Sequence, residues 1–482
     1  MSSLLNRLMK MANKWSFYCV FFILICFAGA GCRKQLSIHA PYSSITTAQV
    51  FADSADAESA LAGIYSNQIN KGSINQWAAG GATVYLGLSA DELMSFSQGD
   101  AQLMQFYNNS LQVSNGYVYN IFWQGVYFTI YQANAIIEGL NKSEQINQSV
   151  KDEITGEAKF FRGLAYFYLA NLFGDVPILT SVDYQKNQVA SRVSKSDVYQ
   201  QIVKDLTDAL TVLPDDYSVG GGEKIRVNKW AATALLARVY LYQGKWSDAE
   251  AAATSIISSG QFSLTQDLNE VFLKNSSEAI LQFQVNSSAP IANATPEGYR
   301  FVFNTPRPPL FYINPSLQSA FDSNDLRKSA WLDSTVYGGK TYYYPYKYKI
   351  GSGQMDPGGD VSEYYMVLRL SEQYLIRAEA KAQLNTDLVG AQSDLNEIRA
   401  RAGLNALENL SQTQLLAAVA QERRFELFAE WGHRWLDLKR TEQADSVLSL
   451  IKPQWQSMQQ LFPIPASELK YDPNLTQNQG YH

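Results

Sequence analysis

The chain has 482 residues, of which 46% are hydrophobic and 17% charged, a composition typical of a protein with a large folded core. Its formal net charge of −6 argues against a nucleic-acid-binding protein, which needs a basic surface to contact phosphates. The three histidines, His39, His433 and His482, are too few to predict a histidine-based zinc cluster.

The first 31 residues have the pattern of a lipoprotein signal peptide. Three basic residues precede an apolar segment, residues 16–28, that is too short to span a bilayer comfortably. Small residues then lead to Cys32. We predict cleavage before Cys32 and attachment of lipid to it, which leaves the mature chain, residues 32–482, without a second cysteine for a disulfide. An ordinary secretory signal that happens to contain a cysteine is the alternative.

Apolar residues at helical spacing predict a scaffold mainly within residues 56–70, 126–257 and 368–440. One predicted helix has Ser196 as its N-cap and ends before Pro214.

Two segments of this scaffold, residues 230–257 and 374–401, each predict a pair of antiparallel helices. Small and aromatic residues recur in them at the offsets of a tetratricopeptide repeat, and Gly244 is placed to form the turn of the first pair. We interpret these pairs as a packed scaffold without a binding role of its own.

Residues 261–360 lack this periodicity and predict an irregular region. Residues 281–285 alternate like a strand, and between Tyr299 and Tyr348 there are 13 aromatic residues in 50, twice the chain average. Loops are normally polar, so this excess indicates a function. Aromatic faces stack on the apolar C–H faces of sugars, which predicts carbohydrate binding.

An earlier loop, residues 74–100, has the same aromatic and polar composition. The candidate ligand-binding residues of the two loop regions are Trp77, Tyr85, Phe96, Tyr312, Trp331, Tyr343 and Tyr346. The alternative for any one of them is that its ring is part of the core.

Residues 415–440 predict a charged helix that continues past Gly432. Glu422, Glu426 and Glu430 share one face of it, and Arg423 and Arg434 have the spacing to pair with them. We predict an ion-pair network, because neighbouring arginines lower the pKa of a carboxyl below what the general acid of a glycoside hydrolase requires. A structural role is also predicted for His433.

The chain closes with an apolar segment, residues 461–481. Prolines on both sides of Ile464 exclude a helix there. We expect the segment to lie extended across the body as a strap that covers its apolar side chains, which are Leu461, Phe462, Ile464, Leu469, Tyr471, Leu475 and Tyr481.

This segment and four blocks before it resemble, in order and spacing, the SusD/RagB family of outer-membrane nutrient-binding lipoproteins. The four blocks are residues 156–179, 368–384, 394–404 and 421–440. The resemblance implies one domain over residues 32–482, mainly α, in which a tetratricopeptide-like scaffold of helix pairs carries an irregular, loop-rich ligand-binding half with a few short strands.

The resemblance also implies a function. A protein of this family captures a glycan or oligosaccharide and delivers it to a SusC-like TonB-dependent transporter, without catalysis. We predict no cofactor or metal site, because no dense carboxylate loop indicates calcium binding. The lipid on Cys32 would anchor it to the outer membrane, where we expect it to face the cell exterior.

Three alternatives remain open from the residues alone. The ligand could be a peptide or glycoprotein. The chain could be a protein-interaction scaffold that binds no glycan. It could also be a glycoside hydrolase, whose carboxylates would come from Asp91, Glu92, Asp322 and Asp325.

Overall fold

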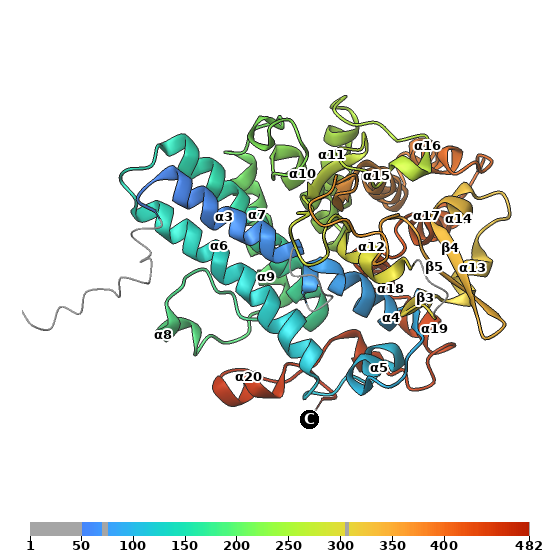
Figure 1. Cartoon of the computed structure of the whole chain (residues 1–482), viewed down its shortest axis with the longest axis horizontal. Helices are drawn as coiled ribbons and strands as arrows, with labels where there is room; N and C mark the ends of the chain where they lie inside the picture. The colour runs from blue at the N-terminus through green and yellow to red at the C-terminus, as the bar shows by residue number, and fades with distance from the viewer. Residues whose placement is uncertain (1–50, 70–75, 304–307, 482) are drawn as a thin grey trace, which may run out of the picture. The chain divides into compact units, whose positions relative to one another are not determined.

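The computed structural model describes residues 51–69, 76–303 and 308–481 (Figure 1). The predicted signal peptide and Cys32 lie outside the described residues. Within the described part of the chain, no helix is both long and apolar enough to cross a membrane.

Four long helices form the first part of the scaffold and pack side by side (Figure 1). They are α3 (Ser54–Ile69), α6 (Gly125–Lys142), α7 (Gln148–Phe173) and α9 (Lys195–Leu210). Helix α7 packs against the other three, and residues 160–173 are all buried. A helix that is covered on several sides has no solvent-facing polar stripe, which explains why the second half of α7 is mostly apolar. Its polar side chains Arg162 and Asn171 are buried and hydrogen-bonded.

Two helix pairs follow, as the repeat offsets predict. They are α10 (Lys229–Tyr242) with α11 (Trp246–Ile257), and α15 (Leu370–Leu384) with α16 (Leu388–Arg401). Gly244 forms the first turn at φ 69°. Leu241 and Ala253 of the first pair share a core cluster with Ile376 of the second, so the pairs stack although more than 100 residues separate them. Helix α17 (Gln412–Glu426) packs on the second pair. The predicted mainly α, tetratricopeptide-like scaffold is confirmed.

The structure corrects two helix boundaries. The helix predicted to continue past Gly432 is broken, because α17 ends at Glu426 and α18 (His433–Arg440) begins after a turn. Ala429, Trp431 and Gly432 have φ of 51°, 50° and 72°, a left-handed conformation that is incompatible with a right-handed α-helix. The N-cap of α9 is Ser194 instead of Ser196, and its hydroxyl accepts a hydrogen bond from the Asp197 amide at 3.1 Å.

In the part of the chain that the structure describes, six short strands form three antiparallel pairs. These are β1 (Leu93–Ser95) with β3 (Phe311–Ile313), β2 (Ala279–Phe283) with β6 (Tyr365–Arg369), and β4 (Leu332–Tyr337) with β5 (Lys340–Pro345). The strand predicted at residues 281–285 is present but starts two residues earlier. Gly338 and Gly339 join β4 to β5 with φ of 59° and 75°, which the tight turn of a hairpin requires.

The remaining elements are short. The α-helical ones are α4 (Gly87–Ser89), α5 (Ala101–Asn108), α8 (Tyr184–Asn187), α12 (Pro296–Phe301), α13 (Pro315–Ala320), α14 (Leu326–Ala330), α19 (Ala444–Leu448) and α20 (Ala466–Tyr471). Two π-helical segments, Trp77–Leu86 and Val118–Gln124, precede α4 and α6, and 3-10 turns occupy Ser218–Gly220, Leu268–Glu270 and Ser457–Gln460.

A buried ion-pair network joins α17 to the irregular region, as predicted, but through different partners. Glu426 pairs with Arg401 of α16, Arg369 of β6 and Arg327 of α14. Burial by itself would raise the pKa of Glu426, but these three guanidinium groups lower it well below its ordinary value. The predicted partners lie elsewhere: Arg423 pairs with Asp437 at 2.8 Å, and Arg434 pairs with Asp91 at 2.7 Å.

The C-terminal segment crosses the helical scaffold. The Phe462 amide donates to the Leu172 carbonyl of α7 at 2.7 Å, and the Tyr481 hydroxyl donates to the Leu461 carbonyl at 2.7 Å. Phe462 and Ile464 are fully buried. The segment is not extended throughout, because it contains α20, and the expectation that it covers all its apolar side chains is wrong for Tyr471, which is 78% exposed.

Candidate ligand-binding site

Five aromatic side chains gather around the β4–β5 hairpin, and we call them the hairpin aromatic cluster. They are Phe96, Tyr312, Tyr337, Tyr342 and Tyr343. Phe96 follows β1 and lies edge-on to Tyr337 and Tyr342, with ring centroids 5.7 and 5.5 Å apart. Tyr312 of β3 meets Tyr342 at 5.1 Å. Phe96, Tyr312, Tyr337 and Tyr342 therefore form one group of rings, although more than 200 residues separate Phe96 from the other three, whereas Tyr343 lies on the opposite face of β5.

Strand alternation explains how the hairpin holds these rings. Tyr342 and Tyr344 point to one face of β5, and Tyr343 points to the other. Tyr344 is buried, and its hydroxyl donates to Asp333 of β4 at 2.8 Å, which fixes the inner face. Tyr337 and Tyr343 remain 45% and 37% exposed, so the hairpin presents rings to solvent.

The cluster has the chemistry of a sugar-binding surface. Its partly exposed rings offer apolar faces, and four of the five carry hydroxyl groups that hydrogen-bond sugar hydroxyls. Ser97 and Gln98 are exposed beside Phe96 and add a hydroxyl and an amide. A cation, the Lys340 ammonium, lies 5.2 Å from the Tyr342 ring centroid.

Three of the seven predicted ligand residues belong to this cluster: Phe96, Tyr312 and Tyr343. Tyr346 is partly buried and lies 6.4 Å from the Tyr344 ring, with the Lys349 ammonium 4.0 Å from its own ring centroid.

The other three predicted ligand residues, Trp77, Tyr85 and Trp331, are at most 2% exposed. The Trp331 indole donates to the Leu268 carbonyl at 2.9 Å, and the Trp77 indole donates to the Thr129 hydroxyl at 3.2 Å. Fully buried rings present no face to a ligand, so a packing role replaces the predicted contact and we leave these three out of the proposed site.

Sequence reasoning missed Tyr337 and Tyr342. The available signal was the Gly338-Gly339 pair, which predicts a hairpin between alternating residues. Had the hairpin been assigned, alternation would have separated Tyr342 and Tyr343 onto opposite faces.

The four candidate hydrolase carboxylates do not form an exposed pair. Asp91 is held by Arg434 at 2.7 Å and Arg424 at 2.8 Å, and Asp325 is held by Arg327 at 2.8 Å. The other two are Glu92, which is 1% exposed, and Asp322, whose carboxylate accepts a hydrogen bond from the Asn324 amide in an exposed loop.

Three carboxyls of this set are buried, and the pKa values of two of them, Asp91 and Glu92, shift in opposite directions. Burial raises the pKa of Asp91, but Arg434 and Arg424 more than reverse this and lower it below its ordinary value. Burial and the adjacent Asp91 raise the pKa of Glu92 to about 8. Among the described residues, no group of acidic, histidine or cysteine side chains is arranged to hold a metal ion.

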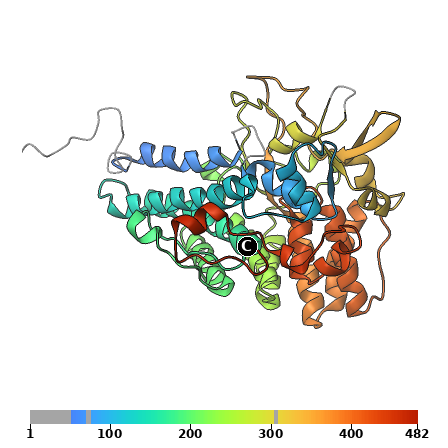
Figure 2. The ribbon, with the colours of Figure 1, turned by 90° about the horizontal axis from the view of Figure 1, so that it is seen from below.

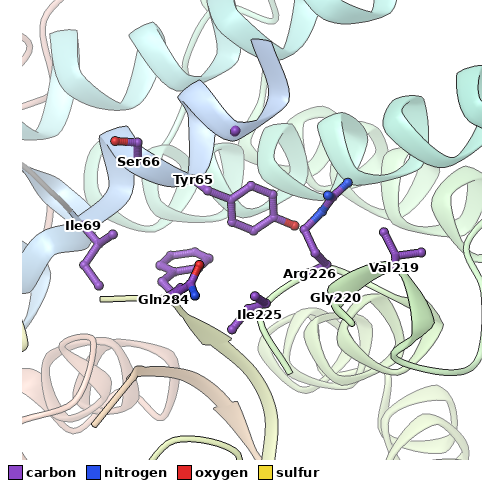
Figure 3. Close-up of a pocket in the computed structure, with 10 residues that line it drawn as sticks. Tyr65, Ser66, Ile69, Val219, Gly220, Ile225, Arg226 and Gln284 are labelled. Carbon is purple, nitrogen blue, oxygen red and sulfur yellow. The ribbon is translucent and has the colours of Figure 1, made fainter. Parts of the chain in front are cut away.

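A separate cavity of about 340 Å³ lies between α3 and the loop before α10 (Figure 3). Tyr65 and Arg226 point toward each other in it. The Tyr65 hydroxyl accepts from the Val227 amide at 2.8 Å, and Arg226 donates to Glu157 at 3.0 Å. These polar atoms hold α3, α7 and the loop together, which indicates a structural role for this cavity.

Comparisons with known proteins agree with this architecture. A family model described as "Starch-binding associating with outer membrane" matches residues 41–241, and a model described as "SusD family" matches residues 258–481. A relative from Formosa agariphila, "SusD-like protein P2", is 25% identical, with 96% of this chain and 99% of the relative covered. A "SusD-like protein" from Bacteroides ovatus is 25% identical over 69% of this chain and 68% of its own length.

Solved structures have the same fold. A "Laminarin binding SusD-like protein" matches with a TM-score of 0.75 and 26% identity, covering 89% of this chain and 99% of its own. A SusD superfamily protein from Bacteroides thetaiotaomicron matches with a TM-score of 0.72 and 26% identity, covering 88% and 99%. Two family models that together span almost all of the described residues, on a scaffold shared with these structures, show that the chain belongs to the SusD/RagB family.

Proposed function

We propose that this protein captures a glycan at the cell surface and delivers it to a SusC-like TonB-dependent transporter. The observation that carries glycan binding is the hairpin aromatic cluster, in which a hydrogen-bonded hairpin presents partly exposed rings. A site of apolar walls with a few polar anchors suits a ligand whose ring faces are apolar and whose edges carry hydroxyls.

The relatives support the class of ligand. A structure that is 26% identical to this chain is described as laminarin-binding, and one matching family model is described as starch-binding. Laminarin and starch are both neutral polysaccharides, so neutral glycans are the first class to test. Anchoring to the outer membrane through Cys32, with the protein facing the exterior, completes the proposed role.

The proposed role is binding without catalysis. Glycoside hydrolysis needs two carboxylates on either side of a bound glycosidic bond. Of the four loop carboxylates considered, Asp91 and Asp325 are held by arginines and Glu92 is buried.

Affinity electrophoresis in native gels tests glycan binding. The full chain is run in gels that contain laminarin, pullulan, xylan or the acidic polysaccharide alginate. We expect at least one neutral polysaccharide to retard it, and the double change Tyr342→Ala/Tyr343→Ala to weaken that retardation. The matched control is Leu450→Ala, which removes a side chain that is 83% exposed on a different part of the chain.

Two outcomes would contradict the proposal. If none of the neutral polysaccharides retards the wild-type chain, glycan capture is wrong, and a peptide or glycoprotein ligand is the next candidate. Release of reducing sugar from any of the four polysaccharides would show that the protein is an enzyme.

A further inference from the structure

A second aromatic surface lies on the helical scaffold, away from the hairpin. A cavity of about 580 Å³ opens between α6, the loop that contains α8, and α20. We call it the α6–α20 groove and define it by Phe128, Tyr131, Tyr184, Glu468, Tyr471 and Asp472. In both ribbon views α20 lies beside α6 and α8, and the β4–β5 hairpin lies at another end of the described chain (Figures 1 and 2).

Four large rings of the groove are exposed to solvent. Phe128 and Tyr131 are 48% and 52% exposed, and Tyr184 and Tyr471 are 74% and 78% exposed. Single exposed apolar side chains are common, but a contiguous group of them around a hollow marks a binding surface. The exposure of Tyr471 also contrasts with Phe462 and Ile464 of the same C-terminal segment, which are fully buried.

Two of these rings share an orientation. Phe128 and Tyr131 are three residues apart on α6 and therefore lie on one helix face. Their ring planes differ by 16° and their centroids are 6.5 Å apart. Nearly parallel, half-exposed rings can contact successive apolar faces of one ligand.

The polar groups of the groove are acidic or neutral. Glu468 of α20 accepts a hydrogen bond from the Trp123 indole at 3.0 Å, and Asp472 accepts one from the Asn474 amide at 2.9 Å. The described residues that line the groove include no lysine, arginine or histidine. A sulfated or uronic-acid glycan would meet carboxylates without a compensating cation, so the charge favours a neutral ligand.

We propose that the α6–α20 groove is a second binding site for neutral glycan. The proposal rests on the proposed function, because it assigns this groove the same class of ligand as the hairpin aromatic cluster. Exposed rings would stack on sugar faces, and the carboxylates of Glu468 and Asp472 would accept hydrogen bonds from sugar hydroxyls.

The size of the groove favours a sugar over a protein partner. A volume of about 580 Å³ falls within the usual range of about 300 to 1,000 Å³ for small-molecule sites. A stable protein interface buries about 800 Å² of surface on each partner. Two binding sites on one protein would also allow it to hold a long polysaccharide at two points, which raises the effective concentration at each site.

Three variants of the full chain test the proposal. The groove variant is Phe128→Ala/Tyr131→Ala, the hairpin variant is Tyr342→Ala/Tyr343→Ala, and the third combines all four changes. Each is run in gels that contain laminarin, pullulan, xylan or alginate. We expect the groove variant to lose part of the retardation by a neutral polysaccharide, and the combined variant to lose several-fold more than either double variant. Alginate in the gel should not retard the protein through the groove.

A conservative variant separates ring stacking from a general packing effect. Phe128→Tyr/Tyr131→Phe keeps both rings and should keep wild-type retardation. Because the Phe128 and Tyr131 side chains are about half exposed, the groove variant and this conservative variant should unfold at the wild-type temperature.

The failure of this proposal is distinguishable from failure of the proposed function. If the hairpin variant abolishes retardation while the groove variant migrates as wild type, the groove is not a glycan site and glycan capture stands. If the groove variant keeps full glycan retardation but loses an outer-membrane protein that copurifies with the wild type, the groove is a protein-docking site and the proposal is wrong. If no neutral polysaccharide retards the wild type, both proposals are wrong.

Discussion

The Phe462 amide donates a hydrogen bond to the Leu172 carbonyl at 2.7 Å and so joins the C-terminal segment to the end of α7. The Phe462 ring packs against Phe122 and Trp435, with ring centroids 5.6 and 6.4 Å apart. Removal of this ring leaves a cavity among aromatic side chains. We therefore expect Phe462→Ala to lower the free energy of unfolding by about 3–5 kcal/mol in urea denaturation.

The matched control for this change lies in the same segment. Tyr471 is 78% exposed, so Tyr471→Ala should change stability by less than about 0.5 kcal/mol. Equal losses from the two changes would show that the segment is not held through Phe462.

Glu426 is the carboxylate that the buried network is built around. Its charge pairs with Arg401, Arg369 and Arg327, which are themselves buried. Glu426→Gln removes the negative charge and leaves three buried guanidinium groups poorly compensated. We expect a loss of about 3–5 kcal/mol in urea denaturation.

The exposed Glu408 provides the comparison, and Glu408→Gln should leave stability almost unchanged. A Glu426→Gln protein as stable as the Glu408→Gln protein would contradict the assigned importance of the network.

Glu92 should make stability depend on pH. Burial raises its pKa to about 8 in the folded protein, whereas the unfolded chain has an ordinary value near 4.3. Between these values the folded state keeps a proton that the unfolded state has lost, so stability falls as pH rises from about 4.3 to 8.

The change Glu92→Gln imitates the protonated form and removes this contribution. We expect the variant to match the wild type at pH 4, where both states of the wild type are protonated, and to be more stable than the wild type at pH 8. Urea denaturation at the two pH values measures the difference. If the difference in unfolding free energy between Glu92→Gln and the wild type does not change with pH, the Glu92 carboxyl keeps an ordinary pKa.

Cys32 is the proposed lipid attachment site. Cys32→Ala removes the acceptor sulfur, so the protein should leave the membrane fraction and should no longer incorporate labelled fatty acid. A single acyl chain anchors a protein to a membrane only weakly, whereas several anchor it firmly. Loss of the whole lipid group should therefore release nearly all of the protein from the membrane fraction. The wild-type chain in a parallel culture is the control, and an unchanged membrane association of the variant would rule out anchoring through this residue.

The helical scaffold could be predicted because the sequence patterns that specify its helices are local. Helical spacing predicts α6 and α7, and the repeat offsets predict the pairs around Gly244 and Ala391. The break before Gly432 could not be predicted in this way. Ala429 and Trp431 adopt positive φ without being glycine, because the surrounding structure holds them there.

The candidate site could be predicted only as a region. The excess of aromatic residues indicated the irregular half, but it did not separate Trp331, which is buried, from Tyr343, which is 37% exposed. Trp331 is buried because Lys347, Arg369 and Arg401 surround its ring with the charged network. Arg369 and Arg401 belong to β6 and α16, which are distant in sequence. The sequence around Trp331 therefore does not indicate that they contact its ring.

Helix α11 packs directly against α15, so the chain leaves the scaffold at Ile257 and returns to the same place at Leu370. The residues between α11 and α15 form a long insertion whose two ends are held together by the stacked helices. Lengthening such an insertion adds little to the entropy cost of bringing its ends together. Relatives can therefore diverge in the length and side chains of this segment, and so in the ligand they recognise, without disturbing the helix stack that supports it.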